Sequence, residues 1–463
     1  MGRSRLMGLA LLVGCSTTEP SGADAGTDAT VGAGTSTPDD GDDSGLPTTG
    51  DGENDGESGG APSPTTAGTT GGSSGDDDAT AGSDTGEPPQ PAALEGYGTL
   101  STFGEGGELC IVTNLDAQGP GSLYDCVTNR DTQDGNPTPR RIEFEVGGTI
   151  EQTQDIPIRQ PYLTIDGLMA PEPGITIAKL GDGTDGALGI TTWPPVGTCG
   201  HDVLVQGIRF VGVWTHDTEE HDQNAGTIGL DGEDLTLCVR NVVINRVTVL
   251  DAQDTGGDIW GSVTDVTVQY SAFLYSLHPN TYSHFPGGEA DQQRERISNH
   301  HNVYAYIHER GPQVRGDIRD SNFEENIMHR WAAFGFGGGY AMRLRCRDGF
   351  CPQRLNVIGN HFTSGGPSLE TALIVGDVSG NDADEAAIDG EVFMSGNRLP
   401  PQNVDETAAP AEFAREPEAE VTLFGPEGLV DQVLPNVGTH FRTAEEVGIF
   451  EEIGQQVTED LGG

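Results

Sequence analysis

The sequence predicts an all-β fold, a right-handed parallel β-helix, for most of its 463 residues. Three observations support this prediction. Apolar residues alternate from about residue 94 onward, one nine-residue block keeps returning, and helical periodicity is nearly absent before TAEEVGIFEEIGQQV at the C-terminus. Alternation is typical of strands, and its repetition at one coil length is typical of a solenoid that stacks its strands in parallel.

The nine-residue block has mostly apolar residues at its second, fourth and ninth positions. It appears as DVLVQGIRF (202–210), NVVINRVTV (241–249), DVTVQYSAF (265–273), RISNHHNVY (296–304), DSNFEENIM (320–328), RLNVIGNHF (354–362) and EVFMSGNRL (391–399). By subtraction of these positions, two intervals are 24 residues and the others are longer, which indicates one basic coil with loops of varying size. Asparagine fills the seventh position of the last four copies and predicts a stacked amide ladder. A β-sandwich also has many short strands, but it need not repeat one pattern.

The N-terminal 93 residues divide into two segments with different compositions. Residues 1–15, MGRSRLMGLALLVGC, have a charged start, a short apolar run and a lipobox-like end at Cys15, which predicts a lipoprotein signal peptide with Cys15 as the lipidated residue. The alternative is an ordinary secretory signal in which Cys15 is incidental. Residues 16–93 are rich in Gly, Ser, Thr, Pro and Asp, with sixteen acids and no bases before Pro91, so we expect a disordered tether. The β-helix and a C-terminal tail then occupy 94–463.

Six cysteines remain when Cys15 is set aside. An even number in an exported chain predicts disulfides, although the sequence alone leaves 15 pairings open. Our expectation is pairing between neighbours: Cys110–Cys126, Cys199–Cys238 and Cys346–Cys351.

Charge excludes several classes of function. The chain has 73 Asp and Glu against 23 Lys and Arg, a net charge of −50. Such acidity argues against a nucleic-acid partner, because phosphate contacts need dense Lys and Arg. The single lysine, Lys179, excludes P-loop, Schiff-base and Ser-Lys chemistry.

Candidate metal ligands lie in the middle coils. They are Asp222 with Asn224, and then Asp254 with Asp258 on either side of a Thr-Gly-Gly segment that we expect to be a turn. Hard oxygen ligands of this kind suit Ca²⁺. A solvated acidic surface is the alternative.

A second cluster is HERGPQVRGDI, in which Arg310 and Arg315 flank Pro312. Proline cannot sit inside a central strand, so it marks a turn or strand edge that fixes the two guanidiniums relative to each other. Arginine forks match carboxylates, and residues 294–354 hold ten arginines in an otherwise acidic chain. This predicts a patch that binds a polyanion.

These motifs, in this order, resemble the pectate lyases, the family-one polysaccharide lyases, over nearly all of 94–450. The most specific element is Arg-x-Pro-x-x-Arg after ISNHHNVY; GELCIVTNLDAQGPGSLYDCV, PYLTIDGLMAPEPGITI and DIWGSVTDVTVQYS accompany it. The resemblance implies a calcium-dependent enzyme that breaks polygalacturonate, or a related uronic acid polymer, by β-elimination. It places Arg310 at the catalytic arginine, which acts on the C5 proton. It also places Asp254, Asp258, Asp222 and Asn224 at calcium-binding positions, and we assign Arg315 to holding the substrate carboxylate.

The sequence also departs from that family. The family's Asp-His in WIDHCSxS is replaced by Asn245-Arg246, and Asn224 stands where a carboxylate is expected. The substrate-binding lysine has no counterpart, and His278 and His284 are the candidates offered instead. His300 and His301 are adjacent, so in a strand they would face opposite sides and form no joint site.

Three functions therefore remain open at this point. The first is a lyase, a monomer anchored by lipid at a bacterial cell surface or outer membrane, or secreted, whose membrane contact is the anchor alone. The second is a non-catalytic β-helix surface protein that binds acidic glycan. The third is an inverting hydrolase on the same fold, which would need paired carboxylates about 6.5–9.5 Å apart.

Overall fold

The repeated block forms two sides of a solenoid. The computed structural model describes residues 93–129, 132–133, 136–152, 154–179, 187–193, 198–214, 216, 228–232, 239–283, 294–334, 339–345, 353–363, 373–375, 391–399 and 420–462. Within these residues, ten strands form one parallel sheet, in the order β1 (Glu108–Val112), β4 (Arg140–Phe144), β7 (Leu163–Asp166), β11 (Val203–Gln206), β14 (Val239–Asn245), β17 (Val263–Gln269), β20 (Arg294–His300), β23 (Ile318–Glu324), β26 (Gln353–Ile358) and β29 (Glu391–Ser395).

The second half of each block forms a strand of another parallel sheet. Its eight described strands are β27 (His361–Phe362), β24 (Ile327–His329), β21 (Val303–Ala305), β18 (Ala272–Leu274), β15 (Thr248–Leu250), β12 (Ile208–Val211), β8 (Ile175–Lys179) and β5 (Gly148–Gln152). The segments between blocks form the third side. Its nine described strands are β10 (Thr198–Cys199), which is antiparallel, β9 (Leu188–Trp193), β13 (Ile228–Gly232), β16 (Asp254–Gly261), β19 (His278–Ser283), β22 (Gln313–Arg315), β25 (Met342–Arg345), β28 (Leu373–Val375), and β6 (Ile156–Ile158), which pairs with β9.

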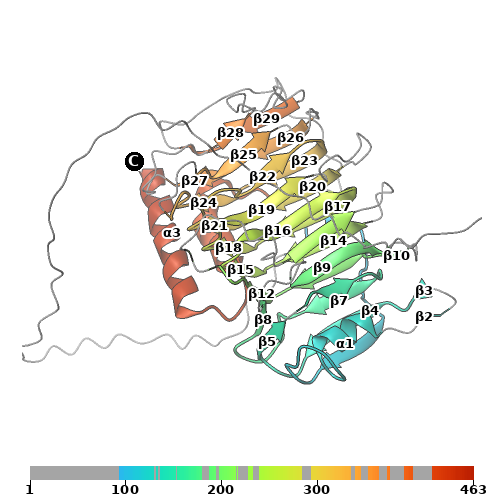
Figure 1. The fold of residues 1–463 in the computed structure, drawn as a ribbon. Coiled ribbons are helices and arrows are strands. Elements are labelled where there is room, and N and C mark those ends of the chain that lie inside the picture. The colour runs from blue at the N-terminus through green and yellow to red at the C-terminus, as the bar shows by residue number, and fades with distance from the viewer. Residues whose placement is uncertain are drawn as a thin grey trace, which may run out of the picture. The chain divides into compact units, whose positions relative to one another are not determined.

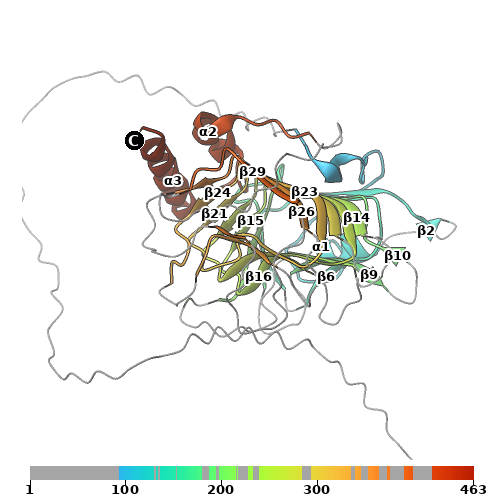
Figure 2. The same cartoon turned by 90° about the horizontal axis from the view of Figure 1, so that it is seen from above.

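The three sheets enclose one continuous core, and the predicted right-handed parallel β-helix is confirmed (Figures 1 and 2). Apolar side chains stack from coil to coil. Val242 pairs in register with Val266, which pairs with Ile297, and all three are 0% exposed. Each coil therefore buries the apolar positions of the block and leaves the alternate positions on the outer faces.

The predicted asparagine ladder is also confirmed. Asn302 Nδ2 donates to Asn326 Oδ1 at 3.1 Å, and Asn326 Nδ2 donates to Asn360 Oδ1 at 2.9 Å. Asn360 continues the ladder to Asn397 at 2.9 Å. The ladder satisfies amides that would otherwise be buried at a considerable free-energy cost.

One prediction about the corner before the ladder was wrong. Strand β20 ends at His300, and His301 occupies the corner with a φ of 55° instead of continuing the strand. The chain turns there, so the two rings meet, with 2.9 Å between His300 Nδ1 and His301 Nδ1.

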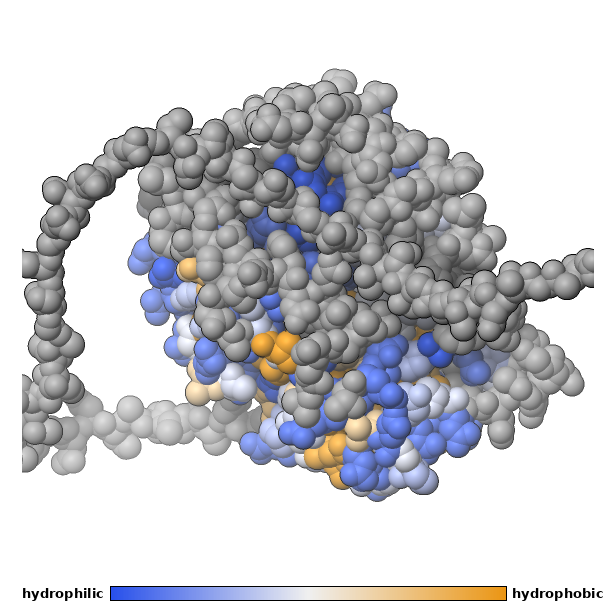
Figure 3. Space-filling view, viewed as in Figure 1, coloured by the Kyte–Doolittle hydropathy of each residue, from blue (hydrophilic) through white to orange (hydrophobic). Residues whose placement is uncertain are grey.

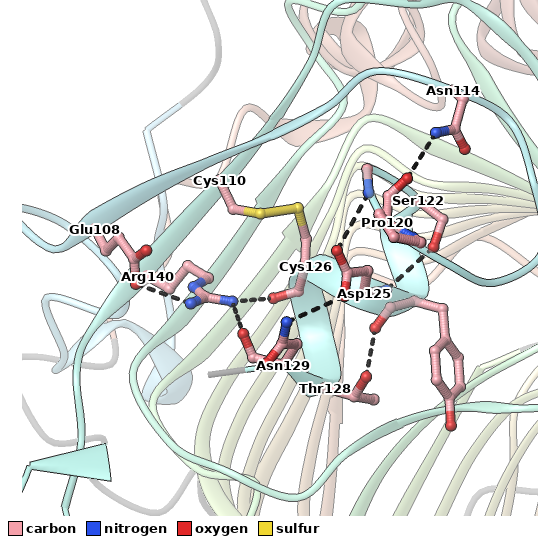
Figure 4. Close-up of a disulfide and its surroundings, with 12 residues drawn as sticks. Glu108, Cys110, Asn114, Pro120, Ser122, Asp125, Cys126, Thr128, Asn129 and Arg140 are labelled. Carbon is pink, nitrogen blue, oxygen red and sulfur yellow. Dashed lines mark hydrogen bonds and ion pairs between the residues drawn. A yellow bond between two sulfur atoms is a disulfide. The ribbon is translucent and has the colours of Figure 1, made fainter. Parts of the chain in front are cut away.

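Helical segments accompany the solenoid. The described helical segments are η1 (Tyr97–Thr99), α1 (Leu123–Thr128), α2 (Gly425–Gly428), η3 (Leu429–Val433), η4 (Leu434–Asn436) and α3 (Ala444–Gly462), and β2 (Thr132–Gln133) pairs with β3 (Asn136–Pro137). Helix α1 is joined to β1 by a disulfide between Cys110 and Cys126, which confirms one predicted pair (Figure 4). Cys199 is disulfide-bonded as well, whereas Cys238, Cys346 and Cys351 lie outside the described residues.

Helix α3, which the C-terminal periodicity predicted, packs on the eight-stranded sheet (Figure 1). Its apolar face, including Phe450 and Ile453, contacts Leu274 and Ala305 of the sheet in one buried cluster. Glu452 then joins the helix to the sheet corner, because it accepts hydrogen bonds from Tyr306 Oη at 2.6 Å and Arg330 Nε at 2.6 Å. His329 Nε2 lies 3.3 Å from the same carboxylate.

This junction predicts a loss of stability in acid. Burial lowers the pKa of His329 to about 4, although Glu452 opposes the shift. The unfolded histidine binds its proton near pH 6.5, so stability is lost as the pH falls from about 6.5 to 4, by up to about 3 kcal/mol. The glutamine of His329→Gln cannot titrate. Between pH 6.5 and 4 we therefore expect the free energy of unfolding of this variant to fall by up to about 3 kcal/mol less than that of the wild type. Denaturant unfolding at several pH values measures it, and parallel curves for the two proteins would contradict it.

Candidate active site

The predicted site residues gather on the outer face of the nine-stranded sheet, which faces the viewer in Figure 1. Asp254 begins β16, and a bulge follows it, with Asp254 opposite His278 and Gly257 opposite Asn280. The segment between Asp254 and Asp258 is therefore a bulged strand, and the predicted turn was wrong. Gly256 permits the close packing of this bulge, because a Cβ there would lie 2.7 Å from the carbonyl oxygen of Pro279.

Two carboxylates and two basic side chains form a closed ring at this point. Asp254 Oδ1 lies 2.9 Å from His278 Nδ1 and 3.0 Å from Arg310 NH1. Glu309 Oε1 lies 3.0 Å from His278 Nε2 and 3.2 Å from Arg310 Nε. Each basic group thus bridges the same two carboxylate oxygens. The ring brings together residues from the starts of β16 and β19 and from the segment before β22.

The two basic side chains of the ring are almost fully buried, and its two acids are partly exposed. The side chains of His278 and Arg310 are 1% and 5% exposed. Burial raises the pKa of Glu309, but the hydrogen bond and charge of His278 and the charge of Arg310 outweigh it and hold that pKa well below its usual range. A side chain so buried presents almost no surface to a polymer, so His278 orients the acids in this structure.

Asp258 lies four residues further along the same strand and has a different environment. Its Oδ1 is buried and accepts no hydrogen bond from any group in the described residues. Burial, with a contribution from the charge of Asp254, raises its pKa to about 7, although Arg310 opposes the shift. An unpartnered carboxylate oxygen beside a second acid fits a hard divalent cation, because such a cation supplies the missing charge and ligand. Among the described residues, no group of three or more His, Cys, Asp or Glu side chains is arranged to hold a metal.

Arginines occupy the coils that follow on the same face. Pro312 lies directly before β22, as predicted for a strand edge, and Arg315 ends that strand. Arg315 pairs in register with Arg345 of β25, and Gln313 pairs with Arg343. Acids at β16 are thus followed by basic groups at β22 and β25. Figure 3 shows hydrophilic residues on this face where the grey atoms leave it visible.

The described structure covers part of the predicted site. It brings together Asp254, Asp258, His278 and Arg310. Arg315 follows Arg310 in the chain and is the last residue of β22. Asp222, Asn224 and His284 lie outside the described residues, as does Cys15. Sequence reasoning missed Glu309, although its position directly before Arg310 in HERGPQVR was a usable signal.

Comparisons with known proteins agree with this picture. No family model matches the chain. Over 284 residues, 61% of the chain, it is 30% identical to the probable pectate lyase C of Aspergillus terreus, and over an equal length it is 31% identical to that of Aspergillus flavus. The chain spans 56% of the length of each of these relatives. Both relatives are fungal, so the bacterial lipoprotein form stays a prediction.

Among solved structures, the fold is similar to that of Jun a 1, the major allergen from cedar pollen. The TM-score is 0.53 at 15% sequence identity, and the match covers 75% of this chain and 93% of the allergen. At this identity the likeness bears on fold alone. The comparisons therefore establish a right-handed parallel β-helix whose sequence is similar to fungal pectate lyases over 284 residues.

Proposed function

We propose that this chain is a polysaccharide lyase that cleaves polygalacturonate, or a related uronic acid polymer, by β-elimination. The sequence similarity to probable pectate lyases supports the class of reaction. The observation that carries the proposal is the ring of Asp254, His278, Glu309 and Arg310 on the outer face of the nine-stranded sheet. It fixes an arginine beside acids and next to further arginines, which is the charge pattern that a polyuronate needs.

In this proposal the chain's own residues divide the work. Arg310 acts on the C5 proton and on the charge that grows on the substrate carboxylate as that proton leaves. The neutral guanidine of Arg310 takes the C5 proton and becomes a guanidinium, and the C5–H electrons form the C4–C5 double bond. The C4–O4 bond breaks with its electrons on O4, which then takes a proton from water. Glu309 and His278 hold Arg310 and Asp254 in position, and Arg315 holds the substrate carboxylate with its planar fork.

Asp254 and Asp258 are the described residues that would hold Ca²⁺. Bound there, calcium would polarise the substrate carboxylate as a Lewis acid. The unpartnered Oδ1 of Asp258 supports this assignment. Asp222 and Asn224 remain predicted ligands.

The function is tested by the product. Full-length protein is incubated with polygalacturonate and with other uronate polymers, with and without calcium, and ultraviolet absorbance from the unsaturated chain end is followed. We expect calcium-dependent growth of that absorbance. New reducing ends without absorbance would indicate the inverting hydrolase instead.

A second candidate, a glycan-binding protein without catalysis, is favoured by one observation. Arg310 contacts two carboxylates at once, and such neighbours stabilise the charged guanidinium, which is a poor base. Binding of polygalacturonate by calorimetry, with no absorbance on any polymer, would establish this candidate over the lyase.

A variant of Arg315 separates substrate holding from chemistry. Arg315→Lys keeps the charge but loses the fork, so we expect KM to rise about tenfold with little change in kcat. Arg354→Lys is the matched control, because Arg354 pairs with Asp320 at 2.6 Å on the ten-stranded sheet. Steady-state kinetics on polygalacturonate measures both. A fall in kcat at unchanged KM would move Arg315 from binding to catalysis.

We also propose that the protein is exported and works as a monomer. The Cys110–Cys126 disulfide supports an oxidising compartment. No helix in the described part of the chain is both long and apolar enough to cross a membrane. Anchoring through Cys15 is tested by lipid labelling of the expressed protein and of Cys15→Ser.

A further inference from the structure

A buried arginine lies at the corner between the ten-stranded and eight-stranded sheets, and strand β15 separates it from the acidic strand β16. Arg246 follows β14 directly, with a φ of 53°. It is 3% exposed, and its Nε makes no hydrogen bond with any described group. It stands where the sequence departs from the pectate lyase motif. An arginine this buried is normally paired, because an uncompensated charge is costly to desolvate.

The C-terminal segment between η4 and α3 lies across this corner. Gly438 N donates to the carbonyl oxygen of Tyr270 at 2.8 Å, and Thr439 N donates to Thr248 Oγ1 at 3.1 Å. Tyr270 is the residue that succeeds Arg246 at the same corner one coil later, and Arg246 N itself donates to Gln269 O at 3.1 Å. These contacts bring His440 and Arg442 to the corner that holds Arg246.

Arg442 is held rigidly there. Its Cζ lies 4.3 Å from the centroid of the Phe450 ring, and its NH2 donates to the carbonyl oxygens of Leu434 and Val437, both at 2.7 Å. Burial, and next the charge of Arg246, lower the pKa of Arg442 to about 10. Burial, Arg246 and Arg442 also lower the pKa of His440.

The neighbouring acid is already bound. Glu446 Oε2 lies 2.7 Å from Arg209 NH2 and accepts from Thr443 N at 2.5 Å. Arg209, Arg246 and Arg442 carry three positive charges against the one negative charge of Glu446, so these four side chains have a net charge of +2 by subtraction. In a chain of net charge −50, such a local excess is unusual.

We propose that Arg246, His440 and Arg442 form a binding site for a small tetrahedral dianion, phosphate or sulfate. The charge of such an anion balances the corner, and its oxygens are the acceptors that guanidinium forks match. The unpartnered Nε of Arg246 and a ring N–H of His440 supply further donors. The site is separate from the proposed catalytic face, so it does not depend on the lyase proposal.

The test measures thermal stability of the full-length protein in inorganic phosphate and in sulfate, against sodium chloride at equal ionic strength. We expect a saturable rise in Tm, about 5 °C at one hundred times the dissociation constant. Isothermal calorimetry with phosphate should give one site per chain. A rise no larger than that in chloride, or an equal rise with monomeric galacturonate, would overturn the proposal.

The change in Tm of the Arg246→Gln variant, without and with phosphate, decides between a binding role and a structural role. Without phosphate the variant should melt at or above the wild-type temperature, because an uncompensated buried charge has been removed. In phosphate it should show none of the additional rise. Arg319→Gln, which removes an exposed arginine paired with Asp317, is the matched control and should keep the full response. If Arg246→Gln melts earlier in chloride and still gains the wild-type increment in phosphate, Arg246 is structural and the site is refuted.

Discussion

Replacing Arg310 with lysine should remove nearly all turnover of polygalacturonate, by about 10²–10⁴-fold, while the protein stays folded. Arg310 uses two different nitrogens at once, NH1 on Asp254 and Nε on Glu309. A lysine ammonium retains the charge but cannot span both carboxylates or present a planar face to the substrate. The change should therefore appear in kcat, because it removes an interaction made in the transition state.

The structure also indicates why folding should survive this change. His278 bridges the same two carboxylates, so Asp254 and Glu309 each keep a hydrogen-bond partner in the variant. Initial rates by ultraviolet absorbance and Tm by calorimetry are measured together, with Arg319→Lys as the exposed control. A structural arginine would give the opposite pattern, an earlier Tm with activity that follows the folded fraction. Near wild-type kcat in Arg310→Lys would end the catalytic assignment.

Much of the fold could be predicted from the sequence because every coil of the solenoid repeats the same pattern of apolar and asparagine positions. The apolar positions of each block face the core, and the seventh-position asparagines stack, as at Asn326 and Asn360. What the repeat cannot give is the conformation of single residues at corners and bulges. His301 turns the chain and meets His300, and the Thr-Gly-Gly segment forms a bulged strand. In the first place a residue with a positive φ, and in the second an extra residue in the strand, changes which side chains meet.

The candidate site was predicted residue by residue but not as a ring. Asp254, His278 and Arg310 were each identified, yet their contacts depend on the register between β16, β19 and the segment before β22. Glu309 escaped notice because acids are common in this chain, and its role appears only where it meets His278. Arg246 was visible as a departure from the family motif, but its basic neighbours are about 200 residues away in the sequence.

Replacing Asp258 with asparagine should weaken calcium binding by about tenfold or more. The affinity of an oxygen-ligand site depends strongly on how many of its ligands are charged. Asp258 contributes a carboxylate whose Oδ1 accepts no hydrogen bond from the part of the chain that the structure describes, whereas Asp254 is already engaged by two basic groups. The loss should not reflect unfolding. Burial raises the pKa of Asp258 to about 7, so ionisation destabilises the calcium-free protein as the pH rises through that value, and asparagine avoids this cost.

Calcium titration by calorimetry at pH 8 measures the effect, with Tm in chelator recorded for each protein. Asp265→Asn is the matched control, because that carboxylate pairs with Arg296 at 2.6 Å on the ten-stranded sheet. Its isotherm should equal that of the wild type. If Asp258→Asn also matches the wild type, calcium does not bind at this strand.

A third variant, Arg310→Gln, should change calcium affinity in the opposite direction. Arg310 NH1 lies 3.0 Å from Asp254 Oδ1, so the arginine acts as a resident cation on one of the proposed ligands. Removing it releases that oxygen and removes a positive charge beside the metal, and both effects favour calcium. Affinity should therefore rise although turnover is lost, a pair of results that misfolding cannot produce. A fall in calcium affinity would mean that Arg310 holds Asp254 in position for the metal instead of competing with the metal for that carboxylate.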